Sequence, residues 1–73
     1  MKFLQTLDLN LLKAFAALMD EQSVSKAAER LAITQPAMSG VLARLRDSFD
    51  DPLFVRVQRG VVPTNRALEL VRK

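Results

Sequence analysis

The sequence predicts a mainly α-helical fold: a winged helix-turn-helix with three helices and a short β-hairpin wing, followed by the start of another helix. Three observations predict it. Apolar residues recur at helical spacing in three consecutive segments, the break between the second and third is short, and a β-branched run with a turn follows them. Two helices joined by a tight turn, with a hairpin after them, are the elements of a winged helix-turn-helix.

The first two helices are expected over about residues 9–21 and 24–31. Asp8 and Ser23 are suited to cap them, because their side-chain oxygens accept hydrogen bonds from the free amides of a first helical turn. The apolar stripe of the first helix comprises Leu9, Leu12, Phe15, Leu18 and Met19, widened by Leu11 and Ala16. The stripe of the second comprises Val24, Ala27, Ala28 and Leu31.

A third helix is expected from its cap residue Thr34 to about residue 48 or 49, with Pro36 in the first turn, where proline costs no hydrogen bond. The turn before it, at residues 32–33, is so short that the second and third helices must meet at a steep angle. Ile33 is expected to fill the gap between them. The apolar stripe of this helix comprises Met38, Val41, Leu42, Leu45 and Phe49.

A hairpin and a fourth helix complete the chain. Because Pro52 cannot continue a helix, the third helix should end before it. Strands are expected over residues 53–57 and 61–62, with Gly60 in the turn free to take a positive φ and Pro63 stopping the second strand. Thr64 then caps a fourth helix from residue 65, whose apolar stripe comprises Ala67, Leu68 and Val71.

These elements divide the chain into two parts. Residues 1–63 form the winged helix-turn-helix domain, with the helix-turn-helix at about 24–43 and the wing at about 53–62. Residues 64–73 form the truncated start of a further helix. Its pattern reaches residue 73 without a C-terminal capping signal, which suggests a fragment of a longer protein.

The composition argues against several classes of function. The 73 residues, 49% of them hydrophobic, make one small globular domain. With no cysteine and no histidine, the chain lacks thiolate ligands and the commonest general base, so we expect no catalytic residue, no metal site and no cofactor. The pair Asp50–Asp51 is interpreted as a helix stop rather than a metal site. No apolar run approaches the ~20 residues of a membrane span, and the N-terminus lacks the apolar core of a secretory signal, so a cytoplasmic location without a membrane partner is expected.

The net charge of +3 is unevenly distributed. Residues 1–33 hold four basic and four acidic side chains, whereas residues 34–73 hold seven basic and four acidic ones. Most of the basic residues in the second part are arginines, which suit phosphate and base edges. Taken alone, +3 is equally consistent with a routine solubility charge.

The outward face of the third helix is the most informative feature. With the buried stripe centred on Met38, Leu42 and Leu45, the helical period turns small or uncharged residues outward, with an arginine at one margin. Gln35 can offer a bidentate amide to adenine, and Ser39 can bond several base edges. The first half of this helix is therefore predicted to enter a DNA major groove, and its free amides to face a phosphate. The face comprises Gln35, Pro36, Ser39, Gly40, Ala43 and Arg44, with Asp47 at its far end, where phosphates would repel it.

Arginines of the hairpin extend this prediction. Arg56 lies on a strand, and Arg59 lies at the turn, where a side chain projects furthest and suits a phosphate or a narrow minor groove. Simpler interpretations stay open. Gln35 and Ser39 are also ordinary first-turn residues, and Gly40 has a helix cost of roughly 1 kcal/mol that favours, without proving, a contact role. Side chains that can instead form surface ion pairs are Arg44 and Arg46, with Asp47, Asp50 or Asp51.

The combination of these motifs resembles the N-terminal domain of LysR-type transcriptional regulators. The resemblance covers about residues 7–68, and its motifs are specific only in combination. The segments 7–12 and 35–39 look most like the branch that includes nodulation-gene activators. The motifs that carry the resemblance are residues 25–31 (SKAAERL), 34–39 (TQPAMS), 52–56 (PLFVR) and 59–60 (RG).

The resemblance implies a bacterial regulator that binds double-stranded DNA, at an operator with paired half-sites, as a homodimer or tetramer. It also implies that the fourth helix is a linker used for dimerisation, and that a C-terminal domain, absent from this chain, senses a small-molecule effector. Residues matching Gln35, Pro36 and Ser39 lie at the bases in the family, and the one matching Arg59 reaches the minor groove. Those near the DNA backbone match Thr34, Arg56 and Thr64.

Two positions depart from the family pattern. Many members carry arginine where this chain has Gly40, so an operator preference cannot be transferred from them. A glycine often stands where this chain has Ala67, a difference of little functional weight.

Three functions are compared, and an enzyme is the least supported of them. The first is sequence-specific DNA binding, and the second is a protein–protein interaction module that docks a partner through the same helix face. The arginines of the hairpin and the basic second part of the chain favour the first.

Overall fold

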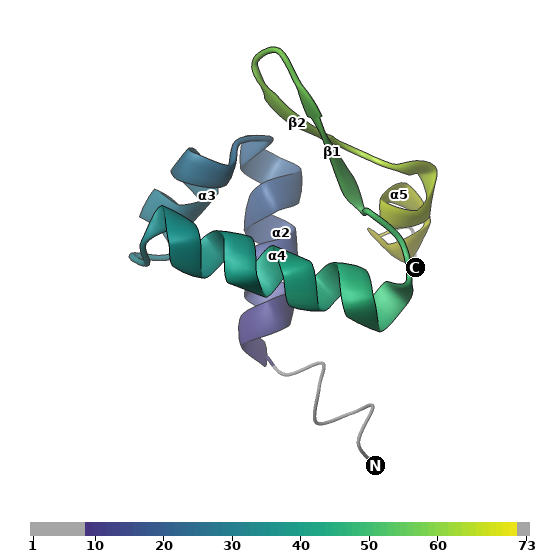
Figure 1. Cartoon of the computed structure of the whole chain (residues 1–73), viewed down its shortest axis with the longest axis horizontal. Coiled ribbons are helices and arrows are strands. Elements are labelled where there is room, and N and C mark those ends of the chain that lie inside the picture. Colours follow the sequence, from purple (N-terminus) through teal and green to yellow (C-terminus); the bar gives the residue numbers. More distant parts are fainter. Residues whose placement is uncertain (1–8, 72–73) are drawn as a thin grey trace.

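The computed structural model describes residues 9–71. It contains the helices α2 (Leu9–Glu21), α3 (Val24–Arg30), α4 (Gln35–Phe49) and α5 (Asn65–Val71), and the strands β1 (Phe54–Val57) and β2 (Gly60–Pro63). Helices α2, α3 and α4 pack against one another, and the antiparallel hairpin β1–β2 projects from this helical body (Figure 1). The predicted winged helix-turn-helix is confirmed. The predicted cap Asp8 and the last two residues of the fourth helix lie outside the described residues.

One hydrophobic core joins the three helices to the base of the hairpin. The ring of Phe54, which begins β1, is fully buried, and its centroid lies 5.6 Å from that of Phe15 on α2. Because side chains of the hairpin enter the core, the wing is part of the folded domain. The core comprises Leu11, Ala14, Phe15, Ala17, Leu18, Val24, Ala27, Ala28, Met38, Leu42, Leu45, Leu53, Phe54, Val61 and Ala67.

Two predicted stripes differ from the buried faces. In α2, Leu12 is 52% exposed and Ala16 is also exposed, whereas Ala14 and Ala17 are buried. The small alanines let α3 and α4 approach α2 closely, and this turns the buried face away from the larger side chain. In α5 only Ala67 of the predicted stripe is buried, and the exposed members are Leu68 and Val71.

The turn between α3 and α4 is as tight as predicted. Ala32 takes a left-handed conformation with φ 59°. Its N–H donates to Glu29 O, and the Ile33 N–H donates to Ala28 O, both at 3.0 Å. These two bonds form a Schellman motif, which ends α3 and reverses the chain within two residues. The expectation that Ile33 fills the gap between the helices is wrong. Ile33 is 36% exposed, whereas Ala27 and Ala28 of α3 are buried.

Strand β1 begins one residue later than predicted and ends at the predicted residue, whereas β2 is one residue longer than predicted at each end. Leu53 is buried but takes φ 63° instead of a strand conformation, and its N–H donates to Asp51 Oδ2 at 2.8 Å. Its carbonyl accepts the Thr64 N–H at 2.8 Å, so the neighbouring pair, Phe54 with Pro63, is a non-hydrogen-bonded pair of the ladder. Pro63 therefore belongs to β2, since its missing N–H is not needed there.

The far edge of the hairpin is fixed to the turn between α2 and α3. Gln22 takes φ 52°, and its carbonyl oxygen accepts the Val61 N–H at 3.0 Å. Gly60 has the predicted positive φ, 137°, and a Cβ there would overlap the same Gln22 oxygen. A glycine is therefore required both by the backbone conformation and by this close approach.

The two glycines of the chain should respond to alanine in opposite directions. Gly60→Ala should lower the free energy of unfolding by about 1–3 kcal/mol, because it combines a strained φ with a clash against a backbone oxygen. Gly40→Ala should raise it by about 1 kcal/mol, because Gly40 lies within a helix and its Cβ would meet no atom within 4 Å. Urea denaturation followed by circular dichroism measures both. Equal effects of the two substitutions would contradict this account of the wing.

Candidate nucleic-acid interface

The start of α4 is built by Thr34 and Pro36. Thr34 is an extended N-cap residue whose Oγ1 accepts the Ala37 N–H at 3.2 Å. Pro36 has no N–H, which leaves the N–H of Gln35 as the first-turn donor without a partner among residues 9–71. The expectation of several free amides is therefore corrected to one, although the positive end of the helix dipole is still directed outward.

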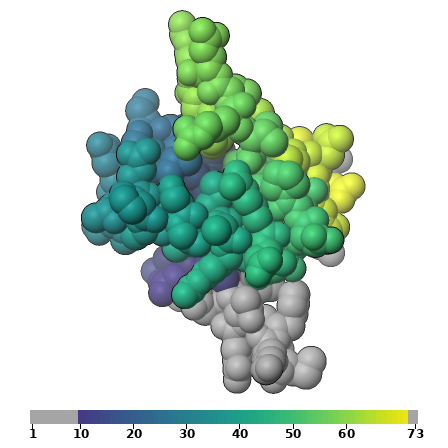
Figure 2. Space-filling view, viewed as in Figure 1, coloured from purple at the N-terminus to yellow at the C-terminus, as the bar shows by residue number. Residues whose placement is uncertain are grey.

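The outward face of α4 contains the residues that the sequence places there. Met38, Leu42 and Leu45 are buried, and they fix the rotation of the helix about its axis. Space around Gly40 is open, so packing within the domain does not explain its lack of a side chain. Figure 2 shows α4 across the front of the molecule with the hairpin projecting beyond it. The exposed residues of the face are Gln35, Pro36, Ser39, Gly40, Ala43, Arg44 and Asp47.

The hairpin adds two exposed arginines. Arg56 lies on β1, and Arg59 lies in the turn between the two strands, at the tip of the projecting arm (Figure 1). Within residues 9–71, Arg44, Arg56 and Arg59 form no ion pair, since the bridges present there join Arg30 to Asp20 and Glu21, and Arg66 to Glu69. For Arg44, the open alternative of a surface ion pair is therefore wrong for the described residues.

Thr64 is engaged inside the domain. Its Oγ1 accepts the Ala67 N–H at 3.1 Å, as predicted for a helix cap, and donates to Asp51 Oδ2 at 2.9 Å. Asp51 thereby holds both Thr64 and Leu53, while Asp50 ends α4 in a left-handed conformation. The interpretation of this acidic pair as a helix stop is confirmed. A contact of Thr64 with the DNA backbone stays a prediction.

Sequence reasoning missed the roles of Arg46 and Gln22. The alternative of an ion pair for Arg46 is wrong, because its guanidinium donates to two backbone carbonyls, from Nε to Pro52 O at 2.8 Å and from Nη2 to Phe54 O at 2.9 Å. Gln22 contributes its backbone oxygen to the far edge of the hairpin. Neither hydrogen bond leaves a periodic pattern in the sequence. The positive φ of Gln22 is uncommon for a residue other than glycine, but it is seen only in the structure.

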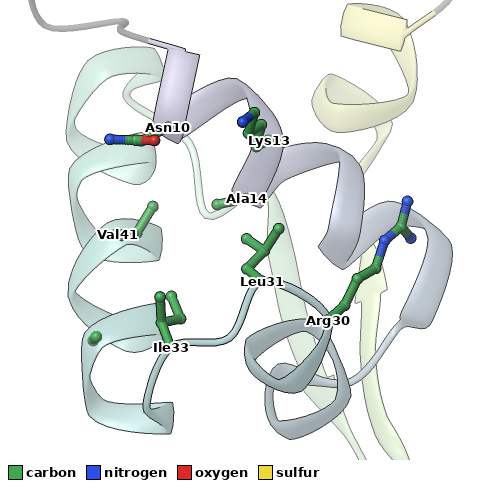
Figure 3. A pocket seen from close by; sticks show the side chains of 8 residues that line it. Asn10, Lys13, Ala14, Arg30, Leu31, Ile33 and Val41 are labelled. Carbon is green, nitrogen blue, oxygen red and sulfur yellow. The ribbon is translucent and has the colours of Figure 1, made fainter.

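A separate groove lies beside this face. It has a volume of about 490 Å³, and residues of α2, the end of α3, the turn between α3 and α4, and α4 line it (Figure 3). At its rim the Arg30 guanidinium donates to Asp20 at 2.9 Å, and this hydrogen bond is the main cause of the raised pKa of Arg30. The lining is mostly aliphatic and includes none of the nine predicted DNA-contacting residues. It consists of Asn10, Lys13, Ala14, Arg30, Leu31, Ile33, Ala37 and Val41.

Two further classes of site were sought in the described part of the chain. Across residues 9–71, no three histidine, cysteine, aspartate or glutamate side chains gather as a metal ion would require. Over the same residues, no helix has the length and apolar character needed to cross a bilayer.

Comparisons with known sequences give a consistent result. The profile of the family described as "Bacterial regulatory helix-turn-helix protein, lysR family" matches residues 9–68. The HTH-type transcriptional regulator LeuO of Escherichia coli is 51% identical over 67 residues, and the HTH-type transcriptional activator NahR of Pseudomonas putida is 52% identical over 67 residues. Each alignment covers 92% of this chain but only 21% of LeuO and 22% of NahR, so the chain spans about a fifth of these relatives.

Solved structures share the fold. A probable transcriptional regulator, PA0477 from Pseudomonas aeruginosa, superposes with a TM-score of 0.87 at 46% identity, covering 96% of this chain and 24% of that one. The DNA-binding domain of BenM in complex with benA site 1 DNA superposes with a TM-score of 0.75 at 32% identity, covering 90% of this chain and 82% of that one. The CbnR domain in a DNA complex has a TM-score of 0.83 at 24% identity, which is a likeness of fold.

Proposed function

Because this chain belongs to the lysR family of bacterial regulatory helix-turn-helix proteins, we propose that it reads a specific double-stranded DNA sequence with the first half of α4 in the major groove and Arg59 in the minor groove. The observation that carries the proposal is the outward face of α4. Its residues are exposed and the space around Gly40 is open, so a duplex can approach the helix closely. The BenM domain, which has the same fold, is described in complex with DNA.

Each proposed contact follows from the chemistry of the side chain. Gln35 and Ser39 present neutral donors and acceptors, which suit base edges. Gly40 has no side chain and the ring of Pro36 is short, so the helix backbone can approach the floor of the groove. Arg44, at the margin of this face, is proposed to contact a phosphate.

The wing and the helix caps extend the interface along the duplex. Arg59 at the hairpin tip suits the strong negative potential of a narrow minor groove. Arg56 lies closer to the base of the hairpin and is proposed to contact the DNA backbone. Thr34 and Thr64 are proposed to lie near that backbone, and Thr34 is an exposed residue at the start of α4.

The assembly implied by the family is also part of the proposal. Residues 1–63 would be the DNA-binding unit, and residues 64–73 the start of a linker helix through which a homodimer or tetramer binds paired half-sites. The exposed apolar side chains Leu12 and Val71, which line one shallow pocket, support a partner beside α5. A small-molecule effector would act through a C-terminal domain of the regulator. A bacterial cytoplasmic location and a place near the nodulation-gene activators stay predictions.

The second candidate, a protein partner on the same face, makes a different prediction about salt. Neutralising several phosphates releases counterions, so DNA affinity should fall steeply as the salt concentration rises. A protein docked on Gly40 and Ala43 should show a much weaker dependence. Arg44, Arg56 and Arg59, which form no salt bridge within residues 9–71, favour DNA.

Substitutions on α4 should separate sequence reading from general affinity. The operator is the duplex recovered from a random pool by selection with the wild-type chain. Gln35→Ala or Ser39→Ala should each weaken binding to it by about 1–3 kcal/mol and leave binding to random duplex nearly unchanged. Fluorescence anisotropy with labelled duplexes measures both affinities. Ser25→Ala, at an exposed position of α3, is the matched control. Equal losses on both duplexes would exclude direct readout by these side chains.

Removing the charge at the hairpin tip should change how strongly DNA affinity depends on the salt concentration. Arg59→Ala should weaken binding to both duplexes and reduce the slope of log K against log salt by about one unit. Arg66→Ala removes the same charge from α5, where the guanidinium pairs with Glu69 at 3.8 Å, and should leave the slope unchanged. If the slope of Arg59→Ala equals that of the wild type, Arg59 does not belong to the interface.

A further inference from the structure

Arg46 joins α4 to the segment that enters the wing. Its side chain lies on the flank of α4 that faces the hairpin, and its Nε and Nη2 donate to the carbonyl oxygens of Pro52 and Phe54 at 2.8 and 2.9 Å. A guanidinium has a planar fork of donors, so it can hold two carbonyls at once, which an ammonium holds less well. The two bonds therefore fix the orientation of this segment relative to the helix.

The Phe54 carbonyl lies outside the ladder of the hairpin. Phe54 faces Pro63 in a non-hydrogen-bonded pair, so its backbone groups point away from β2. Its N–H donates to Pro52 O at 2.6 Å, and its carbonyl is held by Arg46. On the opposite edge, the Val61 N–H donates to Gln22 O. Hydrogen bonds thus hold the hairpin at both outer edges. On one edge, the donor is the side chain of Arg46 on α4.

From this geometry we infer that Arg46 is a positioning residue for DNA binding, one that sets where Arg59 lies relative to the outward face of α4. The inference rests on the proposed function. Each strand has four residues, so at about 3.3 Å per residue the tip lies about 13 Å beyond the base of the hairpin. The bond from Val61 to Gln22 holds β2 one residue from its start, and Arg59 lies beyond this bond in the turn, so a small rotation of the hairpin about it moves Arg59 by more than the ~0.5 Å that a preorganised contact tolerates.

A direct phosphate contact is the competing role for Arg46. Its side chain is exposed, and three of its five N–H donors are not used by the two carbonyl bonds. Lysine separates the two roles, because it keeps the charge and most of the reach but lacks the fork. In the phosphate role, Arg46→Lys preserves the salt slope, and its effect is independent of Arg59. In the positioning role, Arg46→Lys reproduces part of the loss of DNA affinity that Arg59→Ala causes.

The test is a double-mutant cycle on the selected operator with Arg46→Lys, Arg59→Ala and the double variant. Arg46→Lys should weaken binding by roughly three- to tenfold, and the double variant should bind no more weakly than Arg59→Ala alone. The salt slope of Arg46→Lys should fall toward that of Arg59→Ala although the charge is retained. Arg66→Lys, a matched substitution outside the interface, should bind like the wild type.

A second readout separates positioning from a general loss of structure. Arg46→Lys should keep the discrimination at bases read by α4, and it should lose the preference for a narrow minor groove where the wing binds. Three outcomes would each overturn the inference. In the first, the affinity losses of the two single variants multiply in the double variant; in the second, Arg46→Lys binds like the wild type. In the third, Arg46→Lys loses discrimination both at the bases read by α4 and at the minor groove. If the wild type prefers no sequence, or if Arg59→Ala has no effect, the proposed function itself fails and the inference fails with it.

Discussion

The placement of the hairpin depends on hydrogen bonds to backbone groups along its two outer edges. A two-stranded hairpin is marginally stable by itself, and its outer edges carry N–H and C=O groups that need partners. Here the Gln22 carbonyl accepts from β2 on one edge, and the Arg46 guanidinium donates to two carbonyls on the other. Asp51 adds a third connection by accepting from Leu53 and Thr64. Without these bonds, the arginines of the wing would have no defined distance from α4.

The hydrophobic core supplies the matching constraint on α4. Met38, Leu42 and Leu45 are buried against α2 and α3, so a different face must point outward. Phe54 brings the base of the wing into the same core through its contact with Phe15. One packed unit therefore presents a helix face and an arm together, which is what simultaneous contact with a major groove and the adjacent minor groove requires.

The sequence predicted the elements well because their signals are local. The caps Ser23 and Thr34 and the positive φ of Gly60 each reflect neighbouring residues, and all three are found in the structure. The errors concern contacts between elements. Leu12 was placed inside because large apolar residues dominate the period, whereas small alanines line the actual contact.

The candidate site was predictable to a similar degree. Its residues on α4 were identified from the helical period, and the exposed arginines of the wing from their places on a strand and at a turn. The role of Arg46 could not be predicted, because a bond from a side chain to distant carbonyls leaves no mark in composition or spacing. The internal bond of Thr64 to Asp51 was missed for the same reason.

The proposed function requires that the outward face of α4 and the tip of the wing contact one DNA duplex at the same time. Its most direct test is a titration of the ¹⁵N-labelled chain with the selected duplex, followed by amide chemical shifts. We expect the largest changes at Gln35, Ser39, Gly40 and Arg59, and little change along the groove at Lys13, Leu31 and Ile33. The largest changes along that groove, with the face of α4 unperturbed, would contradict it.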